Sequence, residues 1–146
     1  MVKSIYAGKV LTVLGPINSC NLGITLCHEH LISDGAFLAR EPSEETEKAM
    51  FNHPVTPDIL WWLRFNGSQN KDNFMLLDED EAIREAMHFK AAGGNSIVVL
   101  TNVGLSRDPK TLARISRMTG LNIIMGSGYY TEKSFNSLVK RKRKMK

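Results

Sequence analysis

The chain has 146 residues, a length that suits one domain with a single hydrophobic core of modest size. Its 19 Lys and Arg residues and 15 Asp and Glu residues give a formal net charge of +4. Six of the basic residues lie within the segment 140–146, so the rest of the chain carries a net negative charge. A body of that charge argues against a domain that binds nucleic acid across its surface.

The cysteine content and the apolar segments indicate in which cellular compartment the protein is found. Cys20 and Cys27 are too few and too close in sequence for a disulfide framework, and their spacing is not that of a structural zinc site. We therefore expect free thiols in a reducing compartment. Residues 1–15 contain no apolar run long enough for a signal peptide, and no segment approaches the roughly 20 apolar residues of a membrane span. These features predict a soluble, cytoplasmic protein without a membrane partner.

The first third of the chain predicts β-structure followed by a loop. Residues 8–17 alternate in polarity and are rich in β-branched side chains, with a break at Gly15-Pro16. Residues 18–23 have the composition of a turn, and residues 23–31 resemble a second strand. We therefore predict a hairpin leading into a strand. Residues 33–55 are polar and irregular and predict a long loop, with room for one short helix, of a kind that is often functional or mobile.

Start signals and apolar spacing predict three helices. Thr56, Pro57 and Asp58 supply a hydroxyl cap, a proline at the first helical position and an acid in the first turn. Asp78 caps a second helix, with Glu81 three residues later, and that helix closes at Gly93-Gly94. Asp108-Pro109 opens a third helix, which ends at Gly120. The core-facing sides expected for the second and third helices are Ala82, Ile83, Ala86, Met87 and Lys90, and Leu112, Ile115 and Met118.

Two further strands follow the second and third helices. Residues 95–103 and 121–130 are continuous apolar runs rich in β-branched residues, which is typical of strands buried on both faces. Alternating buried strands and amphipathic helices predict an α/β fold with a parallel sheet of βαβ units. Residues 131–146 offer no further buried strand and end in a charge block that we expect to be disordered. The predicted organisation is therefore a body, 1–131, and a basic tail, 132–146.

His28 and His30 are the strongest candidates for a functional site. In a strand they point to one side together with Leu26, while Glu29 points to the other. Two imidazoles one pleat apart can both reach a single divalent ion, and both lie near the carboxyl end of the strand, where α/β sheets place their active sites. Two histidines that are merely hydrogen-bonded at a polar strand end would give the same short pattern. Spacing alone leaves both interpretations open.

Other polar or aromatic residues are weaker candidates. His53 lies in the predicted loop, and His88 lies on the polar side of the second helix, where we expect it to be exposed. Gly126-Ser127-Gly128 lacks the Lys of a phosphate-binding loop and predicts a tight turn. The remaining expectations are that Trp61 and Trp62 pack, that Cys27 is a small core residue, and that Glu29 faces the outer layer.

Three stretches in the same order resemble the phosphotriesterase family of the amidohydrolase superfamily. They are GKVLTVLGPI with LGITLCHEHLI near the start, EAIREAMHFKAAGGNSIV in the middle, and GLSRDPKTLARISRMTGLNIIMGSGYY towards the end. The resemblance covers residues 8 to about 131 and is far more specific than the His-x-His pattern alone. It implies the N-terminal portion of a (β/α)₈ TIM barrel, incomplete, with about three βα units and an N-terminal hairpin.

The resemblance also implies a chemistry. Family members hold two divalent metals, usually zinc, and a metal-bound hydroxide attacks an ester or amide of a small-molecule substrate. The first-strand histidines ligate one metal, a role that falls on His28 and His30. The branch of closest register suggests small N-acyl metabolites. The other ligands belong to strands four, five, six and eight, which this chain does not include, so we expect a truncated, catalytically impaired form with at most a partial zinc site and no assigned catalytic residue.

Two alternatives of other classes stay open at this point. The segment KRKRK, residues 140–144, could act in nuclear import or nucleic-acid binding, which would make the chain a small, non-catalytic basic binding protein. An open sheet edge could instead pair with a full-length relative and make the chain its non-catalytic partner. Salt-sensitive binding through the tail, or co-elution with that relative, would favour one of these alternatives.

Overall fold

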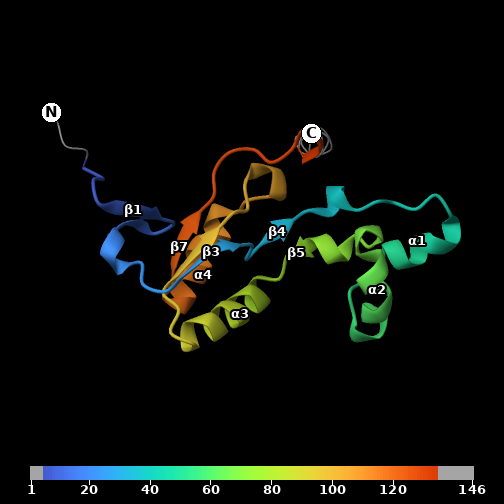
Figure 1. Cartoon of the computed structure of the whole chain (residues 1–146), viewed down its shortest axis with the longest axis horizontal. Coiled ribbons are helices and arrows are strands. Elements are labelled where there is room, and N and C mark those ends of the chain that lie inside the picture. The colour runs from blue at the N-terminus through green and yellow to red at the C-terminus, as the bar shows by residue number, and fades with distance from the viewer. Residues whose placement is uncertain (1–4, 135–146) are drawn as a thin grey trace.

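A three-stranded parallel sheet forms the centre of the molecule (Figure 1). The computed structural model describes residues 5–134. The strand order is β3-β6-β7, with β6 in the middle. The strands are β3 (Thr25–Glu29), β6 (Ser96–Val99) and β7 (Asn122–Met125), and the long helices are α3 (Glu79–Ala91) and α4 (Pro109–Thr119). Because α3 precedes β6 and α4 joins β6 to β7, the predicted βαβ arrangement is confirmed.

Local capping fixes both long helices where the sequence predicts them. The Asp78 side chain accepts a hydrogen bond from the backbone N–H of Glu81 at 2.9 Å, which satisfies one of the unpaired donors at the start of α3. At the start of α4, Asp108 accepts from the N–H groups of Lys110 and Thr111, and Pro109 takes the first helical position. Gly120 ends α4 with a φ of 67°, a left-handed conformation that a residue without a Cβ adopts at little cost.

The core lies between the sheet and the two helices. It consists of Ala82 and Ala86 of α3, Leu112 and Ile115 of α4, and Ile97, Val99, Leu121 and Ile123 of the strands and their edges. The helix faces are narrower than predicted, because Met87 is 43% exposed and Met118 is 60% exposed. Each ends on the solvent side of its helix rather than against the sheet.

The N-terminal hairpin is shorter than predicted and lies earlier in the chain. Strands β1 (Lys9–Thr12) and β2 (Gly15–Asn18) pair with each other, so all of the hairpin except Asn18 falls within the first predicted strand segment, 8–17, and the turn directly follows Thr12. The Thr12 hydroxyl donates to the Gly15 carbonyl at 2.7 Å and closes that turn. The N–H of Val13 donates to the Ile123 carbonyl of β7 at 2.8 Å, which attaches the hairpin to the central sheet.

A helical lobe replaces most of the predicted loop and lies at the opposite end of the molecule from the hairpin (Figure 1). Two short antiparallel strands, β4 (Ser33–Asp34) and β5 (Met75–Leu76), form its base, and α1 (Glu45–Phe51) and α2 (Leu60–Asn66) extend from it. Between residues 5 and 134 the structure also has six 3₁₀ turns: Ser19–Asn21, Ala36–Leu38, Pro57–Ile59, Gly67–Gln69, Asp72–Phe74 and Val103–Leu105. The expected single short helix is α1.

Two expectations about the lobe are wrong. Thr56 stands at the predicted helix start but accepts no capping hydrogen bond, and Pro57 opens a 3₁₀ turn that leads into α2. Trp61 is 68% exposed instead of packed, whereas Trp62 is half-buried. The outer side of α2 is therefore largely uncovered.

Two expectations concern the membrane and the tail. No helix within residues 5–134 has the length and apolar character needed to cross a membrane. The predicted basic tail lies almost entirely outside the described residues, which include only residues 132–134 of it.

Candidate metal centre

The two candidate histidines lie at the carboxyl end of β3, on either side of Glu29. Leu26 is paired with Ile97 and Glu29 with Val99, so three residue steps on β3 match two on β6. This extra residue is a β-bulge, which shifts the alternation of side chains along β3. Ile97 and Val99 both face the helices, and the register places Leu26 and Glu29 with them. Glu29 thus faces the outer layer as predicted, but the prediction that Leu26 shares a side with the histidines is wrong.

The rings of His28 and His30 are neighbours and lie edge to face. Their centroids are 6.1 Å apart, with an interplanar angle of 66°. With Zn–N bonds of about 2.0–2.1 Å, each centroid lies about 3.2 Å from a shared ion, so two ligand centroids can be at most about 6.4 Å apart. A tetrahedral angle would bring them to about 5.2 Å, which requires the rings to approach by about 1 Å. The centroid separation therefore lies within the range that two imidazole ligands of one divalent metal can span.

His30 is held in place by a residue from the neighbouring strand. Its Nδ1 atom lies 2.8 Å from Oγ1 of Thr101, a residue that is fully buried just beyond the end of β6. Burial lowers the pKa of His30, the neighbouring His28 lowers that pKa further, and Glu29 raises it in part. The net lowering favours the neutral imidazole, which is the form that binds metals. His28 is exposed and has no hydrogen-bond partner within residues 5–134.

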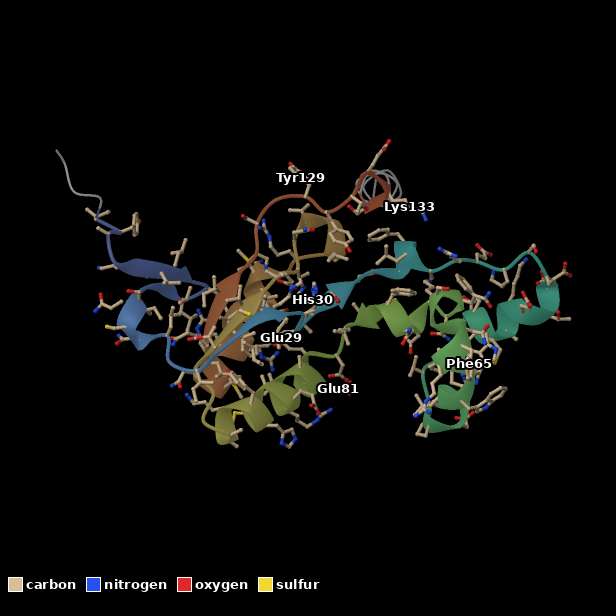
Figure 2. The ribbon with its side chains drawn as sticks, viewed as in Figure 1. Glu29, His30, Phe65, Glu81, Tyr129 and Lys133 are labelled. Atoms are coloured by element: carbon tan, nitrogen blue, oxygen red, sulfur yellow. The ribbon has the colours of Figure 1, made fainter. Side chains whose placement is uncertain are left out.

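Two cavities meet at His30. The larger has a volume of about 410 Å³ and lies between the end of β3, the start of α3 and strand β5. The smaller has a volume of about 280 Å³ and reaches from His30 towards Tyr130. Figure 2 shows His30 at the centre of the molecule with Glu81 of α3 nearby, while Phe65 lies far away in the lobe. Besides His30, four acidic residues line the larger cavity: Asp72, Asp78, Glu81 and Glu85.

The other candidates do not join this site. His53 is half-buried in the lobe, where its Nδ1 lies 2.7 Å from the Pro54 carbonyl, and His88 is exposed on α3 as predicted. Cys27 is exposed rather than a core residue, because β3 is an edge strand of the sheet. Gly126 follows directly after β7, and Gly128 has a φ of 91°, which is consistent with the predicted turn.

The ligand set within the described residues is limited to the histidine pair. No group of three or more His, Cys, Asp or Glu side chains within residues 5–134 could hold a metal ion together. The residue in contact with the histidine pair that the sequence did not single out is Thr101, whose Oγ1 lies against His30. A polar residue at the end of a buried apolar strand, in the run VVLT, was the available signal.

The sequence matches the model of the phosphotriesterase family over residues 8–145. N-acetyltaurine hydrolase from Xenopus tropicalis is 44% identical over 135 residues, and the enzyme of that name from Homo sapiens is 39% identical over 137 residues. Each alignment covers 92% of this chain and 38% of the relative. The chain therefore spans less than two fifths of the length of these curated relatives.

Solved structures agree with this assignment. A resiniferatoxin-binding protein from Rhodobacter sphaeroides superposes with a TM-score of 0.85 and 42% identity, over 94% of this chain and 38% of that protein. A lactonase from Listeria monocytogenes superposes with a TM-score of 0.61 at 22% identity and supports the fold alone. These matches confirm the predicted partial (β/α)₈ barrel, with β3, β6 and β7 as its parallel strands. On this evidence the chain belongs to the phosphotriesterase family.

Proposed function

We propose that this chain carries the first-strand half of the metal site of a zinc-dependent hydrolase. The observation that carries this proposal is the pair His28 and His30, whose rings lie 6.1 Å apart at the carboxyl end of a parallel strand in a member of the phosphotriesterase family. Parallel α/β sheets and barrels hold their catalytic groups at that end of the strands. The carboxyl ends of β6 and β7 lie at the same edge, and the segments that follow them place Leu105 and Tyr130 in the smaller cavity with His30.

The residues of this site have separable roles. His28 and His30 would hold the metal through imidazole nitrogens, and the cavity of about 410 Å³ beside His30 is large enough for a small-molecule substrate. When bound, zinc supplies a Lewis acid that polarises the scissile bond and lowers the pKa of a water molecule. Burial lowers the pKa of His30, which favours the neutral ring whose lone pair can bind a metal.

The proposed substrate class is a small molecule with an ester or amide bond, such as an N-acylated amine. The support comes from relatives that are named N-acetyltaurine hydrolase and that match 92% of this chain. An amide of that kind places a carbonyl carbon next to a nitrogen leaving group, which is the centre that a zinc hydrolase attacks.

The described residues supply two ligands, whereas catalytic zinc sites usually have three from the protein. We therefore expect residues 1–146 alone to hydrolyse substrate slowly at best. We also propose that the barrel portion extends over residues 1–131, with 132–146 as a basic tail, and that the chain works in the cytoplasm. Both cysteines are free thiols in the structure, which suits a reducing compartment.

The proposal is tested by following release of acetate from N-acetyltaurine by proton NMR, with and without zinc. We expect slow release that requires zinc and that is lost in the double variant His28→Ala/His30→Ala. The matched control, His53→Ala/His88→Ala, removes two histidines outside the site and should behave like the unmodified chain. Release that persists in the site variant would contradict the assigned ligands. If zinc causes no release from N-acetyltaurine or from simple esters, the proposal that this chain is a hydrolase is refuted. The metal site would then be tested separately by measuring zinc content.

A further inference from the structure

We propose that Thr101 is a positioning residue that selects which nitrogen of His30 binds the metal. Its hydroxyl occupies Nδ1, so Nε2 is the ring atom that remains for coordination. This inference rests on the proposed function, because it assigns a role to Thr101 only if His30 is a metal ligand.

The hydroxyl of Thr101 is fixed in space by its backbone. Thr101 is fully buried and follows β6 by two residues. The N–H of Leu100, its neighbour, donates to the Glu29 carbonyl at 2.9 Å, which joins the ends of β6 and β3. On the other side of Thr101, the Asn102 side chain accepts from the N–H of Gly104 at 3.0 Å. Oγ1 therefore stands in a rigid segment, 2.8 Å from the ring of His30.

Because a neutral imidazole has two different nitrogens, the contact between Thr101 and Nδ1 determines which nitrogen of His30 can bind a metal. Such a ring has one protonated nitrogen and one lone pair, and metal binding uses the lone pair. With Nδ1 against Oγ1, binding through Nε2 requires the proton to reside on Nδ1, where it donates to the threonine oxygen. The ring stays neutral, because a proton leaves Nε2 to solvent and one is taken up at Nδ1. Metal-ligating histidines commonly donate their other N–H to a fixed acceptor in this manner.

His28 provides the contrast. It is exposed and lacks a hydrogen-bond partner within residues 5–134, so no hydrogen bond fixes the orientation of its ring. The orientation of the pair therefore depends on His30, and through it on Thr101. Removing the hydroxyl should leave the His30 ring without a fixed orientation as well, and so increase the loss of side-chain entropy on metal binding.

The variants for the test are Thr101→Val, Thr101→Ser and Thr12→Val. Valine keeps the shape of threonine without the hydroxyl, and serine keeps the hydroxyl. Thr12 is a buried threonine in the hairpin whose hydroxyl donates to the Gly15 carbonyl, so its valine variant loses a comparable hydrogen bond away from the site. Zinc affinity is measured by competition with a chromophoric chelator, which requires no enzymatic activity.

We expect Thr101→Val to weaken zinc binding by about 10- to 100-fold, the usual effect of removing a hydrogen-bond partner from a metal ligand. Thr101→Ser and Thr12→Val should bind like the unmodified chain. Equal zinc affinity in Thr101→Val and the unmodified chain would overturn the proposal and leave the metal site intact. A loss in Thr12→Val as large as in Thr101→Val would show that general destabilisation explains both.

Nitrogen-15 NMR of the histidine rings gives a second, independent measurement. In the zinc-loaded chain, His30 should carry its proton on Nδ1 and its metal on Nε2, and ligation through Nδ1 would overturn the inference. If the unmodified chain binds no zinc, the proposed function fails. The metal-free spectrum still tests the contact itself, because the Nδ1 resonance of His30 should differ between the unmodified chain and Thr101→Val, and an unchanged resonance would refute the role of Thr101.

Discussion

Gly126 and Val99 join the carboxyl ends of β7 and β6 by a contact that leaves no room for a side chain. The N–H of Gly126 donates to the Val99 carbonyl at 2.7 Å. A Cβ atom at Gly126 would lie 2.8 Å from that same oxygen and 3.2 Å from the backbone of Leu100. Because the obstructing atoms belong to the backbone, they cannot move aside without disturbing the strand ends that carry the candidate site.

Gly126→Ala should therefore destabilise the fold by about 1–3 kcal/mol, the typical cost of forcing extra atoms into a packed region. Urea denaturation followed by circular dichroism measures this change. The neighbouring exposed position provides the control, since Ser127→Ala should change the free energy of unfolding very little. Equal stability of the two variants would mean that the strand ends are looser than the structure shows.

The sequence predicts that both Leu112 and Met118 of α4 face the core, but only Leu112 does so in the structure. Leu112 is 1% exposed and lies in the core cluster, whereas Met118 is 60% exposed. Leu112→Ala should cost about 2–5 kcal/mol, because it removes buried methyl groups and leaves a cavity. Met118→Ala should cost less than about 0.5 kcal/mol. Thermal or urea unfolding of both variants checks the ranking, and a comparable loss in Met118→Ala would contradict the orientation of the helix.

Asp108 should stabilise the fold in a pH-dependent manner. The N–H of Thr111 is the main cause that lowers the pKa of Asp108 below its usual value of 3.8, with further help from the Thr111 hydroxyl and the Lys110 N–H. Because this pKa is lower in the folded state than in the unfolded chain, the contribution is complete above the unfolded value and is lost as the pH falls through the lowered one.

Asp108→Ala should cost about 1 kcal/mol at neutral pH, the usual loss for a helix N-cap. The difference from the unmodified chain should shrink as the pH falls below about 4. Asp108→Asn keeps a capping oxygen without the charge. The contribution of residue 108 to the free energy of unfolding should then not depend on pH. Urea unfolding at a series of pH values gives the comparison, and a difference that grows in acid would have the wrong sign.

Asn70 holds the helical lobe together from the inside. It is fully buried, its Nδ2 donates to the carbonyls of Met50 and His53, and its Oδ1 accepts from the N–H of Asn73. Asn70→Asp would place carboxylate oxygen against two carbonyl oxygens and leave both without their donor, at a cost of about 1–3 kcal/mol or more. Hydrogen exchange should rise in residues 45–74 and stay unchanged in the β3-β6-β7 sheet. An equal increase in hydrogen exchange in the lobe and in the sheet would contradict the view that the lobe can open independently of the sheet.

The elements that the sequence predicted well are those fixed by neighbouring residues. Asp78 and Asp108 cap their helices, and Gly120 ends α4, because each of these interactions spans only a few residues. Leu112 and Ile115 are buried as expected, since they lie at the middle of the apolar face of α4. Strands β6 and β7 also follow from their apolar composition, although each is shorter than the run from which it was predicted.

The elements that the sequence could not predict depend on pairing between distant segments. The β4–β5 pairing joins two-residue strands at either end of the lobe, too short to leave a periodic pattern. The bulge between Leu26 and Glu29 exists only in the pairing of β3 with β6, so the side of Leu26 could not be predicted from alternation. Thr101 meets His30 across the same pair of strands, and its role is visible only in three dimensions.

The central claim is that His28 and His30 together hold a zinc ion. The most direct measurement is the zinc content of the purified 146-residue chain after equilibrium dialysis against buffered zinc, beside His28→Ala/His30→Ala and the control His53→Ala/His88→Ala. We predict close to one zinc per chain in the unmodified protein and in the control, and none in the site variant. A chain that retains no zinc, or zinc that persists when both His28 and His30 are replaced, would contradict the assignment.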